Sequence, residues 1–559
     1  MALWAAAASA CGGDGVTVVT VSSRPAVRGV EDLEVALANA NATLTETFSV
    51  DGRTFPLTFS IDTGGRDGVL ELRGEALDGA GIAVGAGVAT VDLGGRTDVE
   101  LMIEPNDFVV NTSFVGDQAL AFRLDAGGRQ LAVAPDGVFT IGWSDSCEVV
   151  GRCDVFGRRF DSTAAPVPAM LAAGTAQFNF NRTNGLVGYE PSIATNEDGA
   201  TLAAWSDGGT LFAVVVDAAG AATALTETTI TDVNVPSTPA VAALPGGRFI
   251  VAWTENTMTA GQFAVKAVWL DDTGRPVTNP VSASTAPYLV SGTLLTQKSP
   301  PALAALGDQA EHAVVWKSGS TLRGRFYNPT GMPRAGDVSL GNFNTDELGE
   351  PQIASLAPDL AVLFARRTTG GDADEGQLVL RRVTNTGART GVDAILTRQL
   401  DPRPMGLATR ADGAIAVAWE ACMADSDDSA CGVRFQVFRP SLAAVGEAVL
   451  ANTTTENTQI EPSVAALPGG AFVAAWSDGS QAAPDTDGFG IRARVIYPPY
   501  DDATGLGGRC TSTSACGEGN ICMAGTDGMP RCYRACTTDR TCDFGGSCTT
   551  MGDESACLF

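Results

Sequence analysis

Histidine and lysine are almost missing from this chain of 559 residues. It contains one histidine, His312, and its 36 basic residues include only three lysines. A Ser-His-Asp or Cys-His catalytic system therefore has a single candidate base, and that base lies in an apolar segment where we expect a strand residue near a turn. Zinc sites built on several histidines are excluded, because only one histidine is present.

Positive charge and long apolar runs are also scarce. The 64 acidic residues outnumber the basic ones and leave a net charge of -28, which argues against nucleic acids and anionic membrane surfaces as partners. No stretch approaches the roughly 20 apolar residues that a membrane-spanning helix needs. No phosphate-binding glycine spacing precedes a helical pattern, so the sequence indicates no nucleotide cofactor.

Glycine (65 residues) and proline (28) are abundant, and so is one repeated unit. The segment Ser463 to Gly479, SVAALPGGAFVAAWSDG, has two apolar runs around a Pro-Gly-Gly turn, which is typical of a β-hairpin. Ala240 to Trp253 is a near copy, and five further copies occur. The aromatic anchors of the seven copies, 48 to 63 residues apart, are Trp143, Trp205, Trp253, Trp316, Phe364, Trp419 and Trp476.

A repeat of this length, made of strands and turns without a helical pattern, predicts the four-stranded blade of a β-propeller. A single blade would leave one sheet face bare, whereas a ring of seven buries these faces with the aromatic anchors packed between blades. An open β-solenoid or a series of β-sandwiches is the alternative. We therefore expect an all-β protein with a seven-bladed β-propeller over residues 111–500.

The residues before the repeats alternate between apolar and polar, as at Val99, Leu101 and Ile103, with Gly/Asp turns between the runs. This pattern predicts a small antiparallel β-sandwich over residues 15–110. The segment resembles the prealbumin-like and fibronectin-like modules of bacterial surface proteins. The resemblance implies a spacer and carries no site.

Residues 1–14 resemble the end of a bacterial lipoprotein signal, because an apolar stretch with small residues directly precedes Cys11. The resemblance implies that Cys11 is diacylated, which would account for the odd number of cysteines, 13. A plain secretory signal is the alternative. We expect an outer-membrane lipoprotein of the bacterial cell envelope, held by lipid alone, or a secreted protein.

Residues 501–559 contain two copies of a four-cysteine module, with spacings C-x5-C-x5-C-x9-C and C-x5-C-x5-C-x8-C. The modules have few apolar residues, so we expect disulfides to hold them, with three pairings open within each module. Zinc would need CxxC pairs or histidines, and neither is present. The modules resemble EGF-like repeats, which implies pairing of the first cysteine with the third and of the second with the fourth. The cysteines are Cys510, Cys516, Cys522, Cys532, Cys536, Cys542, Cys548 and Cys557.

Acidic loops follow the aromatic anchors of blades five, six, seven and one, and we expect them to form an arc on one face. Two of these loops carry cysteine pairs, Cys147 with Cys153 and Cys422 with Cys431, which we expect to be bridged. Clustered carboxylates suit Ca²⁺ or a cationic partner, and acidic turns that serve solubility are the alternative. No cofactor other than calcium is indicated. The candidate calcium ligands are Asp372, Asp374, Asp425, Asp427, Asp485 and Asp487.

No catalytic constellation is evident in the sequence. The Trp-Ser-Asp-Gly strings at Trp205 and Trp476 are similar to sialidase Asp-boxes, with the order of aromatic and acid reversed. The repeats resemble bacterial secreted repeats of the type PxVAxLxxGxFVVAWxSDG, which carry no catalytic residues over. We expect a monomeric, non-enzymatic extracellular or cell-surface binding or scaffold protein, with a protein or glycan ligand on the acidic loop face. The alternative is a propeller-type hydrolase or lyase that acts on extracellular polysaccharide.

Overall fold

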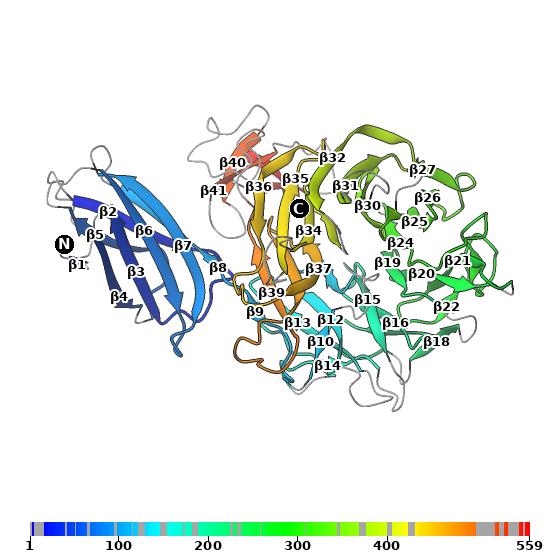
Figure 1. The fold of residues 1–559 in the computed structure, drawn as a ribbon, viewed down its shortest axis with the longest axis horizontal. Helices are drawn as coiled ribbons and strands as arrows, with labels where there is room; N and C mark the ends of the chain where they lie inside the picture. Colours follow the sequence, from blue (N-terminus) through cyan, green and yellow to red (C-terminus); the bar gives the residue numbers. More distant parts are fainter. Residues whose placement is uncertain are drawn as a thin grey trace. The chain divides into compact units, whose positions relative to one another are not determined.

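The structure is a computed structural model in which the chain forms two compact units (Figure 1). One unit comprises residues 1–108 with 494–497, and the other comprises residues 109–493 with 498–559. The described residues form strands, turns and loops but no helix, and so no membrane-spanning helix is found among them. The described residues are 3–4, 16–39, 42–50, 52–63, 68–93, 98–114, 116–120, 129–145, 154–171, 174–181, 188–223, 227–231, 236–257, 259–307, 309–343, 347–367, 376–399, 405–422, 431–498, 520–524, 530–534, 547–551 and 554–558.

The first unit is a β-sandwich with the strand order β1-β5-β2-β8-β7-β6-β3-β4. Strand β8 joins the two halves, because it pairs with β2 along six residues and with β7 at only two. Alternate side chains such as Leu33, Val35 and Leu37 point into one core that both halves share. The strands are β1 (Leu3–Trp4), β2 (Val16–Ser23), β3 (Asp32–Asn39), β4 (Ala42–Ser49), β5 (Leu57–Asp62), β6 (Val69–Leu77), β7 (Ala83–Asp92) and β8 (Asp98–Pro105).

Seven antiparallel sheets form the propeller of the second unit (Figure 1). Blade one contains β10 (Gln118–Ala119), β11 (Leu131–Val133), β12 (Phe139–Asp145), β13 (Val155–Phe160) and β14 (Phe178–Asn179); blade two β15 (Tyr189–Thr195), β16 (Thr201–Ser206), β17 (Leu211–Val216) and β18 (Thr228–Thr231); blade three β19 (Ala240–Leu244), β20 (Arg248–Asn256), β21 (Phe263–Leu270), β22 (Pro276–Val277) and β23 (Tyr288–Leu289); and blade four β24 (Ala302–Ala305), β25 (His312–Ser318), β26 (Thr321–Phe326) and β27 (Val338–Asn342). Blade five contains β28 (Glu347–Leu348), β29 (Gln352–Leu356), β30 (Asp359–Arg367), β31 (Gly376–Val383) and β32 (Arg389–Gln399); blade six β33 (Met405–Thr409), β34 (Ile415–Cys422), β35 (Cys431–Phe438) and β36 (Ala444–Leu450); and blade seven β37 (Gln459–Ala466), β38 (Phe472–Asp478), β39 (Gly490–Ile496) and β9 (Phe108–Val109).

The ring of blades is closed. The innermost strands contact one another in the order β11, β15, β19, β24, β29, β33 and β37, and β37 contacts β11 in turn. Strand β9, from the start of the propeller sequence, supplies the outer strand of blade seven, and Val110 N–H donates to the carbonyl of Ile491 at 2.7 Å. These contacts confirm the predicted seven-bladed β-propeller and exclude the open solenoid. Phe108 and Val109 fall within the range assigned to the sandwich from the sequence, but the propeller uses them.

The aromatic anchors of blades two to six pack against the preceding blade. Trp253 of blade three shares a buried core with Leu202 and Val215 of blade two, and Trp316 of blade four shares one with Ile250 of blade three. Both tryptophans are 0% exposed, so they bury their full area between neighbouring sheets. This is the role that the repeat pattern predicts.

Aspartates shape several turns between the third and fourth strands of a blade. Asp161, Asp217 and Asp271 each accept N–H groups from residues two and four positions later, at 2.8–2.9 Å. Burial alone would raise the pKa of Asp271, but hydrogen bonds from Thr273 and Arg275 outweigh burial and hold that pKa below its usual value. These acids of the chain therefore serve as turn formers.

Two short hairpins make up the described part of the tail. Strand β40 (Asn520–Ala524) pairs with β41 (Pro530–Arg534), and β42 (Ser547–Met551) pairs with β43 (Glu554–Leu558), which gives one hairpin in each four-cysteine module. The remaining tail residues lie outside the described part of the chain.

Candidate active site

Three glutamates occupy the same position at the first end of an innermost strand. Glu190, Glu350 and Glu461 each stand directly before a proline, in blades two, five and seven. The innermost strands of a propeller surround its axis, so residues at their first ends gather near the axis on one face. The ring therefore brings together carboxylates that are far apart in the sequence.

Arg129 of blade one reaches across the ring. Its Nη2 atom lies 3.5 Å from the carbonyl oxygen of Pro351 in blade five, while Nη1 has no hydrogen-bond partner within the described part of the chain. The residue is only 8% exposed. Burial lowers the pKa of Arg129 to about 10, and the charges of Glu350 and Glu190 limit the fall. The guanidinium thus stays cationic at neutral pH and lies close to both carboxylates.

Glu350 is held by two residues of blade four. Lys317 Nζ lies 3.3 Å from Glu350 Oε1 and also donates to the carbonyl of Leu348 at 2.9 Å. The Ser299 hydroxyl donates to Glu350 Oε2. The Lys317 and Glu350 side chains keep 19% and 12% exposure, so solvent reaches this side of the cluster.

Glu190 and Glu461 share an unusual backbone. Their φ angles are 51° and 58°, in the left-handed region that disfavours residues with a side chain. At these points a register shift interrupts the pairing of β15 with β16 and of β37 with β38. The preceding blade holds each backbone in place: Glu190 N–H donates to Ser144 Oγ at 2.9 Å, and Glu461 N–H donates to Glu420 Oε1 at 2.7 Å. Such a conformation costs about 1–3 kcal/mol, and strain of this kind gathers at functional sites.

A hydroxyl orients each of these two carboxylates. Thr238 Oγ1 donates to Glu190 Oε2 at 2.6 Å, and Ser477 Oγ donates to Glu461 Oε2 at 2.8 Å. Glu190 and Glu461 are 2% and 5% exposed, so both side chains are held at the edge of the protein interior rather than in open water. A fixed, largely desolvated carboxylate is suited to general acid–base chemistry.

We call these residues the axial cluster. Six blades contribute to it, and its four carboxylates and two cations give a formal charge of -2. The sequence analysis missed this group, although the Glu-Pro pair before three of the repeats was a usable signal. The members are Arg129, Glu190, Lys317, Glu350, Glu420 and Glu461.

Two of the predicted calcium ligands lie instead in the closure of the ring. Asp485 is 5% exposed, and its Oδ2 accepts the Asn111 side-chain amide at 2.6 Å, while Asp487 Oδ2 accepts Gly116 N–H at 3.1 Å. No group of three or more acidic, cysteine or histidine side chains in the described residues could hold a metal ion. The other four candidates, Asp372, Asp374, Asp425 and Asp427, lie outside the described residues, so calcium binding stays a prediction.

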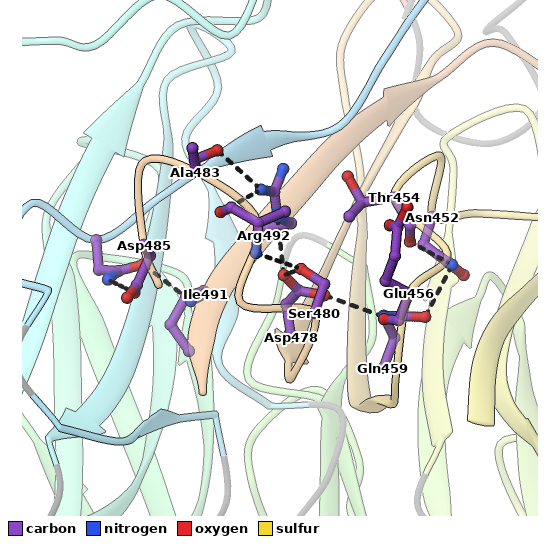
Figure 2. Close-up of polar contacts among 12 residues, drawn as sticks. Asn452, Thr454, Glu456, Gln459, Asp478, Ser480, Ala483, Asp485, Ile491 and Arg492 are labelled. Carbon is purple, nitrogen blue, oxygen red and sulfur yellow. Dashed lines mark hydrogen bonds and ion pairs between the residues drawn. The ribbon is translucent and has the colours of Figure 1, made fainter. Parts of the chain in front are cut away.

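A buried polar network stiffens blade seven beside this closure. Figure 2 shows Asp478 accepting hydrogen bonds from Arg492 Nε at 2.8 Å, Ser480 Oγ at 2.5 Å and Gln459 Nε2 at 3.1 Å. Gln459 in turn accepts from Asn452 at 3.0 Å. Three of these hydrogen bonds lie within blade seven, and the fourth joins it to Asn452 in the connection from blade six, so the network supports the fold.

The cysteines predicted to be bridged or lipidated lie in blade six, in the tail and outside the described residues. Cys422 and Cys431 face one another across β34 and β35, and their sulfur atoms are bonded at 1.95 Å. In the tail the backbone register sets Cys522 opposite Cys532 and Cys548 opposite Cys557. The tail side chains lie outside the described residues, as do Cys11, Cys147 and Cys153, so lipidation and the remaining pairings stay predictions.

We compared the chain with known proteins. No protein family model matches the sequence, and no curated protein matches it. The chain is similar in structure to NanB sialidase from Streptococcus pneumoniae, with 10% identity, 86% of this chain and 94% of that chain covered, and a TM-score of 0.37. It is similar to a GH93 α-L-arabinofuranosidase of Fusarium graminearum, with 11% identity, 55% of this chain and 91% of that chain covered, and a TM-score of 0.34. It is also similar to a GH43 endo-arabinanase from Bacillus licheniformis, with 12% identity, 45% of this chain and 95% of that chain covered, and a TM-score of 0.25.

These comparisons correct one expectation. The sequence analysis expected a non-enzymatic binding or scaffold protein, and that expectation is wrong, because the structural neighbours are mostly enzymes named as arabinanases, arabinofuranosidases and sialidases. At 10–15% identity the likeness concerns the fold alone.

Proposed function

We propose that this protein is a propeller-type glycoside-cleaving enzyme, a hydrolase or lyase, that acts on extracellular polysaccharide at the axial cluster. The observation that carries the proposal is the pair Glu190 and Glu461. Both are held in a left-handed backbone by the preceding blade, and both carboxylates are oriented by a hydroxyl. Two positioned carboxylates are the equipment that glycosidic bond cleavage requires.

In hydrolysis one carboxylic acid gives its proton to the glycosidic oxygen as the bond to the sugar carbon breaks. The other carboxylate either attacks that carbon or takes a proton from the attacking water, and water supplies the new hydroxyl. Arg129 lies close to Glu190 and Glu350, and Lys317 pairs with Glu350, so positive charge accompanies these carboxylates. The cluster thus contains an acid, a base and fixed positive charge on one face.

The test is a hydrolysis screen on purified protein with arabinan, xylan, mixed-linkage glucan, polygalacturonate, alginate and sialosides, followed by variants tested on whichever polymer is cleaved. Glu190→Gln and Glu461→Gln keep size and hydrogen bonding but remove the acid, so we expect at least about a 100-fold loss of kcat. Thermal unfolding of each variant should stay near that of the wild type.

Glu255→Gln is the matched control. Glu255 is a buried glutamate outside the axial cluster, bonded to Lys266 at 2.6 Å and to Trp253 Nε1 at 2.7 Å. Its variant should keep full activity. The proposal fails if the wild type cleaves none of these polymers, or if both axial variants are as active as the control.

The cell-envelope features belong to the same proposal. A lipid on Cys11 would hold the enzyme at the cell surface, where polysaccharide is met, and disulfide-bonded, EGF-like tail modules would suit an oxidising compartment. The acidic loops after the anchors start at the strand ends where the axial cluster lies, so a glycan could contact both. Calcium would find its ligands in these loops, if it binds.

A further inference from the structure

The axial cluster has more negative than positive charge. It contains four carboxylates and two cations; Glu190 and Glu350 lie close to Arg129, and the whole chain carries -28. Burial strengthens the electrostatic interactions of these carboxylates, because Glu190, Glu420 and Glu461 are only 2%, 6% and 5% exposed. A carboxylate on a ligand would therefore be repelled by the carboxylates of the site and by the net negative charge of the protein.

Arg129 nevertheless has a donor to offer. Its Nη1 atom is buried and lacks a hydrogen-bond partner among the described residues, although it belongs to a charged group. Leaving such a donor unsatisfied costs free energy, and buried polar groups in folded proteins are nearly always paired. Since Glu190 and Glu350 both lie close to the guanidinium, an oxygen acceptor that reaches Nη1 must sit near carboxylates.

We propose that the axial cluster is selective for neutral sugars, with Arg129 Nη1 donating to a sugar oxygen while sugar hydroxyls donate to the carboxylates. A hydroxyl group both donates and accepts, so one uncharged ring satisfies both kinds of partner. A uronate cannot do so without adding charge. This inference rests on the proposed function and narrows it to hydrolysis, because lyase elimination needs a carboxyl group on the sugar to acidify the proton that is removed.

The experiment compares neutral and anionic polymers on the full chain, with binding and cleavage measured separately. Affinity gel electrophoresis with arabinan, xylan or glucan should retard the wild type, and polygalacturonate and alginate should not. Arg129→Lys keeps the charge but shortens the reach of the donor, so retardation by the neutral polymer should weaken about tenfold. Arg381→Lys is the matched control: Arg381 is 6% exposed and paired with Asp393 at 2.6 Å in blade five, so its variant should bind as the wild type does.

The outcomes separate the two proposals. Binding or cleavage of polyuronates as well as neutral polymers overturns the selectivity while leaving an enzyme at the site. Neutral binding that weakens in Arg129→Lys without cleavage of any polymer overturns the proposed function and supports the ligand class. Neutral binding unchanged in Arg129→Lys means that water satisfies Nη1, which overturns the role of Arg129, and no binding to any polymer overturns both. The wild-type comparison needs no variant, so misfolding of Arg129→Lys cannot mask the selectivity result.

Discussion

His312 should make the propeller sensitive to mild acid. The side chain is 0% exposed, stacks on Tyr327 with ring centroids 4.0 Å apart, and shares a 2.8 Å hydrogen bond between Nδ1 and the Ala310 carbonyl. Burial lowers the pKa of His312 from 6.5 to about 4, and the Ala310 carbonyl limits the fall. The folded protein therefore favours the neutral imidazole.

The sign and size of the pH effect on stability follow from the pKa of His312, which is 6.5 in the unfolded chain and about 4 in the folded protein. Above pH 6.5 both folded and unfolded chains are neutral at this residue, so it contributes its full stability there. As the pH falls toward 4, the unfolded chain binds the proton and the folded chain does not, which lowers the free energy of unfolding by about 2 kcal/mol at pH 5 and about 3 kcal/mol at pH 4. That loss is large against the 5–15 kcal/mol that is typical of folded domains.

The chain offers a clean assay because it has a single histidine. With isotope-labelled histidine, NMR should show one imidazole signal that does not titrate between pH 7 and 5. The variant His312→Phe keeps an aromatic ring for the stack on Tyr327. In urea unfolding its free energy of unfolding should fall less than that of the wild type between pH 7 and 4.5. At pH 7 its free energy of unfolding should be lower than that of the wild type, because the Ala310 carbonyl loses its hydrogen-bond partner. An imidazole signal that titrates near 6.5, or equal acid sensitivity in both proteins, would refute the reasoning.

Three further predictions concern turns, closure and anchoring. Asp271→Ala should lower the free energy of unfolding by about 1 kcal/mol because its turn loses side-chain acceptors, whereas Asp271→Asn should lose less; urea midpoints decide this, and equal midpoints would contradict it. Asp485→Ala should destabilise by about 1–3 kcal/mol, since Asn111 loses a buried partner, whereas the exposed Asp487→Ala should change little. A Ca²⁺-dependent rise in Tm that both variants abolish would favour a metal site instead. Cys11→Ser should move the protein from the membrane fraction to soluble extract, and a wild type that is already soluble counts against lipidation.

The propeller could be predicted because its signals are short-range. The unit from Ser463 to Gly479 contains its own turn, two strands and a packing anchor within seventeen residues, and the same unit recurs. The closure of the ring could not be predicted from the sequence, because β9 is a two-residue strand with no periodicity. The closure depends on contacts such as the hydrogen bond from Ile491 to Asn111, 380 positions apart, so no local pattern could identify it.

The axial cluster was missed for a related reason. Each glutamate lies alone in its repeat, and only the closed ring brings Glu190 and Glu350 to the same buried guanidinium. Apart from the proline that follows each of them, nothing in the sequence distinguishes these glutamates from the acids that form turns, such as Asp217. The acidic loops attracted attention because their carboxylates are neighbours in the chain, but Asp485 proved to be a structural partner of Asn111.

Ring assembly by itself does not explain why glutamate occupies these positions. Leu120 of blade one makes the same contact with the preceding blade, since its N–H donates to Ser477 Oγ at 2.9 Å, as Glu190 N–H donates to Ser144 Oγ. Leucine makes that bond without a carboxylate and without a left-handed backbone, whereas Glu190 and Glu461 adopt one. Because this conformation and a buried carboxylate both cost free energy that the blade contact does not require, the proposed role at the axis explains the two glutamates better than the joint between blades does.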